Sequence, residues 1–375
     1  MSDDLTKLIA FYLPQYHTVP ENDEWWGKGF TEWRNVARAR PLFRGHYQPH
    51  LPADLGFYDL RVPEVRQAQA AMARQYGIGA FCYYHYWFNG RRILERPFNE
   101  VLASGEPDFP FCLCWANENW TRAWDGGSRQ VLLAQAYSDA DDEAHFHALL
   151  PAWLDPRYLR HDGRPVFLVY AASQLPDPLR TTTRWRELAR THGLPGLYLL
   201  RVESVHEERT DPRPLGFDAA VEFQPDWRRL SEPRWRHYRR RLVQKLGLQP
   251  PRSWQQHIRD YREVVDIALA KPVPSYPSFP CVTPSWDNSA RRTTGASILR
   301  DCAPAIYESW LRQVIERQKP EFVFINAWNE WAEGCHLEPC QRFGLAYLEA
   351  TQRALRPATS AQAEVRRAAP RFSPP

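Results

Sequence analysis

The chain has 375 residues, of which 43% are hydrophobic and 25% are charged. This composition is typical of a globular protein, and the length is sufficient for one large barrel or two ordinary domains. The net charge of +4 is small for this size and does not indicate nucleic-acid binding, and no apolar run approaches the roughly 18 residues that a membrane span requires.

The cysteines indicate a reducing compartment. There are seven, an odd number, and no two form a Cys-x-x-Cys pair, so the sequence predicts neither a disulfide framework nor a zinc site. Several lie in apolar runs, where a free thiol behaves as a small hydrophobic group. The N-terminus has no basic segment followed by a long apolar one, so we expect no signal peptide and a cytoplasmic location. The seven are Cys82, Cys112, Cys114, Cys281, Cys302, Cys335 and Cys340.

Tryptophan is more frequent than a core requires. The 16 Trp residues stand beside 17 Tyr and 18 Phe. Aromatic faces stack on the C–H faces of pyranose rings, while N–H and O–H groups bind the hydroxyls. The composition therefore favours a sugar-binding cleft without specifying one.

Eight short apolar runs rich in aromatic and β-branched residues predict eight buried strands. They are residues 8–12, 80–84, 109–114, 165–170, 197–200, 219–223, 279–283 and 322–325. Helical patterns follow nearly all of them, at 63–76, 97–103, after the N-cap Ser138, 182–192, 255–270, 305–318 and 343–355. This alternation predicts an α/β fold, a single-domain (β/α)8 TIM barrel over residues 1–356. A doubly wound sheet is the alternative, but no glycine-rich phosphate loop follows the first strand.

Two segments do not belong to the alternating strands and helices. The stretch from the end of the first strand to about residue 60 is rich in aromatic residues, Gly and Pro. We expect this long irregular loop to fold over a cleft, because it contains too many large aromatics to be disordered. Residues 357–375 are rich in Pro, Ala and Ser, and we expect a disordered tail there.

The segment after the last predicted strand is the candidate catalytic site. Glu330 and Glu333 stand three residues apart, between tryptophans and asparagines, directly after the apolar run 322–325. A helical turn would place their Cβ atoms about 5–6 Å apart. Sugar chemistry uses such a carboxyl pair, one group as proton donor and the other as base or nucleophile. Two solvated surface glutamates are the alternative, which the flanking Trp and Asn residues disfavour.

Polar and aromatic residues also follow the other predicted strands. In a (β/α)8 barrel the carboxyl ends of the strands meet at the face that holds the active site, so we expect these side chains to converge on one cavity, with a pyranose stacked between them and the two glutamates. The candidate substrate-binding residues are Tyr12, His17, Trp26, His46, Tyr84, His85, Trp87, Trp115, Asn117, Glu118, Glu222, Trp286, Asp287, Asn326 and Trp328. Some of the tryptophans are expected to belong to the core instead.

Several of these candidates have a structural alternative. Glu118 could form an ion pair with Arg122. Glu222 lies in an apolar strand, where an unpaired carboxylate costs several kcal/mol, so it either pairs with Arg201 or faces the barrel mouth.

Two further groups could bind a metal or a phosphate. His17, His46 and His85 lie on separate loops without metal-ligand spacing, so we predict no metal site and expect them to bind hydroxyls. The arginines of segment 228–241 form either a solvated loop or a contact for the phosphate of a lipid- or nucleotide-linked glycan. They are Arg228, Arg229, Arg234, Arg236, Arg239, Arg240 and Arg241.

Seven motifs along the chain resemble those of the WbsX-like family, whose members are associated with bacterial polysaccharide loci and are often labelled glycosyltransferases. The motifs are residues 11–17, 24–33, 45–49, 83–88, 114–120, 286–288 and 328–334. The resemblance runs from about residue 8 to residue 355. It implies an oligosaccharide or polysaccharide substrate.

That family is in turn similar to glycoside hydrolase family 99, the endo-α-mannosidases and endo-α-mannanases, which are (β/α)8 barrels. The similarity rests on the Asn-Glu-Trp-x-Glu-Gly pattern at 329–334. It implies a retaining reaction through a 1,2-anhydro sugar, with Glu330 as base on the 2-hydroxyl and Glu333 as general acid/base. Family 99 has His where this chain has Ala332, so the resemblance does not specify the sugar.

The sequence thus favours a glycoside hydrolase that acts on a bacterial surface polysaccharide or its precursor, without a cofactor. A glycosyltransferase in O-antigen or lipopolysaccharide biosynthesis and a non-catalytic glycan-binding barrel remain open. The oligomeric state is not predicted.

Overall fold

The computed structural model describes residues 6–122, 130–204, 209–230, 245 and 251–356. The predicted tail at 357–375 and most of the arginine-rich segment, from residue 231 onward, lie outside the described residues.

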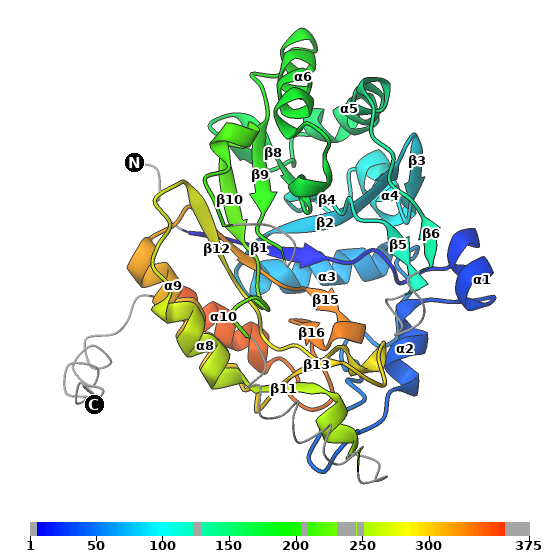
Figure 1. The fold of residues 1–375 in the computed structure, drawn as a ribbon, viewed down its shortest axis with the longest axis vertical. Coiled ribbons are helices and arrows are strands. Elements are labelled where there is room, and N and C mark those ends of the chain that lie inside the picture. The colour runs from blue at the N-terminus through cyan, green and yellow to red at the C-terminus, as the bar shows by residue number, and fades with distance from the viewer. Residues whose placement is uncertain (1–5, 123–129, 205–208, 231–244, 246–250, 357–375) are drawn as a thin grey trace.

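Eight parallel strands form a closed barrel (Figure 1). Each pairs in parallel with the next in chain order, and the last pairs with the first, where Ala10 lies opposite both Phe81 and Ile325. Their residues are almost all buried, as expected for strands that are covered on both faces. The predicted (β/α)8 TIM barrel is therefore confirmed. The strands are β1 (Lys7–Tyr12), β2 (Ile78–Phe88), β4 (Phe111–Trp115), β8 (Arg164–Val169), β9 (Tyr198–Val202), β10 (Ala219–Glu222), β12 (Ser278–Val282) and β14 (Phe322–Ile325).

Each predicted helix is present, but three begin three or more residues from the predicted start: α6 begins four residues earlier, at Pro178, α10 three residues later, at Ala346, and α8 six residues later. Ser138 caps α5 as expected, its side chain accepting a hydrogen bond from Asp141 N. The helix predicted at 255–270 begins only at Tyr261, because Asp260 caps it and the preceding residues form the strand β11 (His257–Asp260). The helices are α3 (Pro63–Gln75), α4 (Arg96–Ser104), α5 (Asp139–Leu154), α6 (Pro178–Thr191), α8 (Tyr261–Ala270), α9 (Pro304–Gln318) and α10 (Ala346–Leu355).

Short strands and 3-10 turns lie in the loops between the barrel strands and the helices. β11 pairs with β13, and β15 pairs with β16 in the turn after β14. The additional strands are β3 (Arg91–Ile93), β5 (Trp120–Thr121), β6 (Val131–Leu133), β7 (Arg160–His161), β13 (Ser297–Arg300), β15 (Asn329–Glu330) and β16 (Cys335–His336). The 3-10 turns are η2 (Ala172–Gln174), η3 (Arg213–Leu215), η4 (Arg252–Gln255), η5 (Asn288–Ala290) and η6 (Trp331–Glu333).

The long loop after β1 is more regular than the sequence predicted. It contains two helices, α1 (Pro20–Trp26) and α2 (Glu32–Arg38), each too short for a clear apolar period. α2 packs on the turn after β14, where the ring of Trp33 lies 5.6 Å from that of Trp331 and 4.6 Å from that of Tyr16. The loop therefore folds back over the segment that carries the two glutamates (Figure 1).

Aromatic rings fill the centre of the barrel. The ring of Phe11 lies 5.5 Å from that of Tyr84, 5.5 Å from that of Phe223 and 5.6 Å from that of Phe324. These residues come from four different strands or strand ends, so their ring contacts stabilise the packing between strands inside the barrel. No helix within the described ranges has both the length and the apolar composition that crossing a bilayer requires.

Candidate functional site

The turn after β14 is a small hairpin. Asn329 and Glu330 pair antiparallel with Cys335 and His336, and residues 331–333 form a 3-10 turn between them. The side-chain amide of Asn329 anchors the hairpin to β1: Leu13 N donates to Asn329 Oδ1 at 2.7 Å, and Asn329 Nδ2 donates to Leu13 O at 3.0 Å. The two glutamates are therefore held on a rigid element at the carboxyl end of the barrel.

A second loop holds this turn from behind. Asp287 N donates to Glu333 O at 2.6 Å, and Ser285 Oγ donates to Gly334 O at 2.6 Å. Gly334 has a φ of +57°, and a Cβ added there would lie 2.9 Å from Asp287 Cβ. Glycine is required at this position both for the left-handed backbone and for the close approach of the two loops.

Both glutamates contact one arginine that the sequence analysis missed. Arg291 Nη1 lies 2.6 Å from Glu333 Oε1, and its Nη2 lies 3.4 Å from Glu330 Oε2. Its Nε lies 3.2 Å from Oε2 of Glu32, the first residue of α2. The side chain of Arg291 is 8% exposed and that of Glu333, the most accessible of the four, is 21% exposed. One buried guanidinium thus bridges three carboxylates from the loops after β1 and β14.

The electrostatics of this cluster favour a shared proton. Burial, with the negative charge of Glu333 as the next cause, raises the pKa of Glu330 to about 8, and burial also raises the pKa of Glu333. Arg291 opposes both shifts, but one guanidinium cannot neutralise three carboxylates. Arg291 lies closer to Glu333, so Glu333 is the better-stabilised anion of the pair. These pKa shifts favour one neutral and one ionised carboxyl group in the pair near neutral pH.

Carboxylates from a second loop approach the same mouth. Burial raises the pKa of Tyr170, at the end of β8, and the charges of Glu118, Glu333 and Glu330 raise it further. Burial likewise raises the pKa of Tyr84, with Glu330 among the charges that add to it. Tyr84 therefore lies within electrostatic range of Glu330, and Glu118 within that of Tyr170, whose ring lies 6.4 Å from that of Tyr84.

A cavity of about 250 Å³ adjoins the arginine. It lies between α1, α2 and Arg291, and includes Trp26, as the sequence predicted, beside Glu32. A water takes about 30 Å³ of liquid volume, so this space corresponds to roughly eight waters or one sugar ring. We call it the Trp26 cavity; its walls are Gln15, Trp25, Trp26, Phe30, Glu32, Arg34, Asn35, Arg38 and Arg291. Arg291 lines this cavity and contacts the two glutamates, which do not line it themselves.

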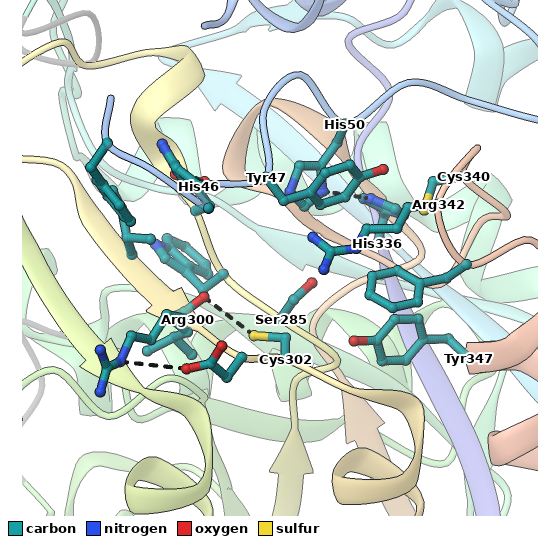
Figure 2. A pocket seen from close by; sticks show the side chains of 18 residues that line it. His46, Tyr47, His50, Ser285, Arg300, Cys302, His336, Cys340, Arg342 and Tyr347 are labelled. Carbon is teal, nitrogen blue, oxygen red and sulfur yellow. Dashed lines mark hydrogen bonds and ion pairs between the residues drawn. The ribbon is translucent and has the colours of Figure 1, made fainter. Parts of the chain in front are cut away.

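His46, Asp287 and Trp286 lie on the other side of the turn, around a second cavity (Figure 2). His46 Nδ1 accepts from Leu42 N, so its Nε2 donates to Asp287 Oδ2 at 2.7 Å. Burial would raise the pKa of Asp287, but the hydrogen bonds from His46 and Ser289 hold it below its usual range. His46 thus fixes the loop that supports Glu333.

Three predicted residues lie between the barrel wall and the surrounding helices. His85 Nε2 lies 2.9 Å from His145 Nε2 of α5, and the rings of Trp87 and His145 are stacked at 4.9 Å. Trp115 packs against His145 and Trp185. The structure does not bring His85, Trp87 and Trp115 together with the glutamates.

Tyr12, Trp328 and His17 also point elsewhere. Tyr12 Oη donates to Gln69 Oε1 of α3 at 2.7 Å, and the ring of Trp328 packs on Phe81 at 5.1 Å. His17 Nδ1 lies 2.9 Å from Pro14 O, and burial lowers the pKa of this histidine to about 4. His17, His46 and His85 therefore have separate partners and do not form one cluster.

Asn117 and Asn326 connect loops. Asn117 exchanges two hydrogen bonds of 2.8 Å with the backbone of Ala171, and Asn326 Nδ2 donates to Gln224 O at 2.8 Å. Both side chains are buried and bonded to the protein itself. They position the loops at the barrel mouth.

Glu222 has a partner that the sequence did not predict. Its Oε2 lies 2.8 Å from Lys271 Nζ, while Arg201 pairs with Glu203. Burial raises the pKa of Glu222 to about 7. This pair lies away from the Glu330–Arg291 cluster and has a structural role.

Arg291 could have been found from the sequence only indirectly. It follows the motif 286–288 by three residues, and a buried pair of acids requires a cation. Of the arginine-rich segment, Arg228 and Arg229 are described, and Arg229 Nε lies 3.6 Å from Asp226 Oδ2. The phosphate-contact hypothesis for the rest falls outside the described residues.

Solved structures share this fold at low sequence identity. The endo-α-mannosidase of glycoside hydrolase family 99 from Bacteroides thetaiotaomicron is 15% identical with a TM-score of 0.53, covering 98% of this chain and 100% of that one. A glycoside hydrolase-like protein is 14% identical with a TM-score of 0.58, covering 96% of each chain. At this identity the comparison supports the barrel and not its activity.

Curated relatives are closer in sequence. The uncharacterized protein WxcX of two Xanthomonas campestris pv. campestris strains, ATCC 33913 and B100, is 46% identical over 365 residues, or 96% of this chain and 51% of theirs. The chain thus spans about half the length of these relatives. The family model described as glycosyltransferase WbsX matches residues 8–351. The chain, whose barrel carries the Glu330–Arg291–Glu333 cluster at its mouth, belongs to the WbsX glycosyltransferase family.

Proposed function

We propose that the chain is a retaining glycoside hydrolase that acts on a bacterial surface polysaccharide or its precursor. The observation that carries the proposal is the coupled pair Glu330 and Glu333, buried at the carboxyl end of the barrel with raised pKa values. One protonated and one ionised carboxyl group are what acid/base cleavage of a glycosidic bond requires. The fold shared with family 99 is in agreement but does not establish the activity.

The reaction that the resemblance implies can be written on these residues. Glu330 takes the proton of the sugar 2-hydroxyl while O2 attacks C1, and Glu333 donates a proton to the departing glycosidic oxygen. Water then opens the 1,2-anhydro ring at C1, with Glu333 as base and Glu330 returning the proton to O2. Two displacements at C1 retain the configuration.

This scheme assigns a specific task to Arg291. In the free protein Arg291 stands 2.6 Å from Glu333 and 3.4 Å from Glu330, so it favours charge on Glu333 and the proton on Glu330. Cleavage requires the reverse distribution. We therefore propose that substrate binding moves Arg291 toward Glu330 and shifts the proton to Glu333.

The surroundings can bind a sugar. Trp26 offers an indole face in the cavity beside Arg291, and Tyr84, Tyr170 and Glu118 offer hydroxyl and carboxylate groups at the mouth. Aromatic faces with a few polar groups are typical of glycan clefts. Asn117, Asn326 and His46 hold the loops around this site through their hydrogen bonds.

A glycosyltransferase is the second candidate, and the description of the family favours it. The same acid/base pair could deprotonate an acceptor hydroxyl. The two reactions differ in the co-substrate, since a transferase requires an activated sugar. The cytoplasmic location and the link to O-antigen or lipopolysaccharide stay predictions.

The test is incubation of the protein with α-mannan and O-antigen oligosaccharides, with and without sugar nucleotides. We expect cleavage without a sugar nucleotide, and loss of at least about a hundredfold in both Glu330→Gln and Glu333→Gln with oligosaccharide binding retained. Glu349→Gln, on the exposed side of α10, is the matched control. Turnover that depends on a sugar nucleotide would favour the transferase instead, and full activity in both variants would reject Glu330 and Glu333 as the catalytic pair.

A further inference from the structure

The second cavity, behind the turn that carries Glu333, is small and rich in hydrogen-bond donors. Its volume is about 90 Å³, which corresponds to roughly three waters at about 30 Å³ each. A phosphate- or carboxylate-sized group fits such a space. The side chains of Arg342, Ser285 and Tyr347 enter it from three different segments (Figure 2).

Arg342 supplies a positive charge at the rim. Its guanidinium carbon lies 4.7 Å from the ring centre of Tyr47 and 5.1 Å from that of Phe343, so two aromatic rings hold it in place. Within the described part of the chain, no carboxylate forms an ion pair with it. A guanidinium fixed in this way is suited to bind an anion.

Two buried donors in the wall lack a partner. Tyr347 is 5% exposed, and its Oη forms no hydrogen bond within the described residues. Trp286 is 7% exposed, and its Nε1 also lacks a hydrogen-bond partner there. An indole N–H can only donate. Buried polar groups are normally satisfied, so these two indicate a ligand that accepts hydrogen bonds.

The acids that also line the cavity are already compensated. Asp287 accepts hydrogen bonds from His46 and from Ser289 N. Asp301 lies 3.5 Å from Arg300. Burial keeps the neighbouring His50 and His336 neutral by lowering their pKa values, to about 4 and about 3. Arg342 is the cation of this wall that forms no ion pair among the described residues, and Tyr347 stands in the first turn of α10, where the helix dipole adds to the positive potential.

We infer that this cavity, which we call the Arg342 cavity, binds a phosphate- or carboxylate-sized anionic group, held by Arg342, Tyr347 and Trp286. The group can belong to inorganic phosphate, a sugar phosphate, a nucleoside diphosphate or a uronic acid. It would bind against the Ser285–Asp287 loop that holds the Glu333 turn, outside the Trp26 cavity. The inference does not depend on the proposed hydrolase reaction.

The test is isothermal titration of the protein with inorganic phosphate, glucose 1-phosphate, a nucleoside diphosphate and glucuronate at constant ionic strength. We expect at least one to bind, with affinity reduced about tenfold or more in Arg342→Gln, since hydrogen bonds to charged groups contribute about 1.5–3 kcal/mol. Tyr347→Phe keeps the ring and removes only the unpartnered hydroxyl, so it should weaken binding without lowering the melting temperature. The ligand that binds most tightly identifies the source of the anion.

The control is Arg356→Gln, an exposed arginine at the other end of α10, which should bind as the wild type does. Absence of binding for all four ligands would overturn the inference. So would binding that is unchanged in both Arg342→Gln and Tyr347→Phe, because the anion would then lie elsewhere. Titration is read without any glycan substrate, so a failed cleavage assay does not affect this result.

Discussion

Replacing Arg291 by Met tests the charge balance of the candidate site. Met preserves most of the buried aliphatic chain and removes the guanidinium that contacts Glu32, Glu330 and Glu333 together. Removal of one partner from a buried ion pair typically costs about 3–5 kcal/mol. We expect a loss of about this size in the free energy of unfolding at pH 8, where Glu333 is the ionised partner of Arg291.

The loss should shrink as the pH falls. Both glutamates of the pair have raised pKa values in the folded protein, with Glu330 at about 8, and removal of Arg291 raises them further. A carboxyl whose folded pKa exceeds its unfolded value stabilises the folded state below the unfolded pKa and loses this contribution as the pH rises through the folded pKa. At pH 5 the variant can protonate its glutamates, so the difference from wild type should fall to about 2 kcal/mol or less.

The assay is urea unfolding of wild type and Arg291→Met at pH 5 and pH 8, followed by tryptophan fluorescence. The matched control is Arg213→Met. Arg213 is 58% exposed and pairs with Asp211 on the surface, so this variant should leave the free energy of unfolding nearly unchanged at either pH. A loss for Arg291→Met that is equal at both pH values, or no larger than that of the control, would refute the charge-balance argument.

Three further predictions concern the same region and the second buried pair. Glu330→Gln removes a carboxyl group with a folded pKa of about 8. The free energy of unfolding of the variant, relative to that of the wild type, should therefore rise between pH 5 and pH 8, by at most about 1.4 kcal/mol per pH unit. A constant difference in urea titrations would contradict the raised pKa of Glu330. Gly334→Ala should cost more stability than Gly295→Ala, because both have positive φ but only the added Cβ at 334 meets a neighbour, at 2.9 Å; equal melting temperatures would show that the loops can separate. Lys271→Met should destabilise by about 3–5 kcal/mol at pH 8 and less at pH 5, since Glu222 loses its cation and has a pKa of about 7; chemical denaturation at both pH values measures this.

The barrel could be predicted because its signal is repeated. Eight apolar runs, each covered on both faces, and the helical patterns between them leave few alternatives. The short helices α1 and α2 could not be predicted in the same way, because seven residues give barely two turns. They depend on tertiary contacts: α2 packs on the turn after β14, and Trp25 of α1 packs on Trp120.

The site was predicted only in part, for two physical reasons. Successive residues of a strand point to opposite faces, so Tyr84 can face the barrel centre while its neighbour His85 contacts α5. An alternation rule applied to β2 would have separated them. Arg291 could not be assigned, because its contact with Glu32 joins positions 259 residues apart, and no local pattern reports such a pairing.

The link between the Ser285–Asp287 loop and the Glu333–Gly334 backbone has a consequence for engineering. Two hydrogen bonds of 2.6 Å hold these segments together. The orientation of Glu333 therefore depends on residues outside its own hairpin. A chimera that inherits the glutamate motif from one relative and the preceding loop from another would misalign the carboxyl group even with every acid intact. Transplanting specificity between members of this family therefore requires that both segments be exchanged together.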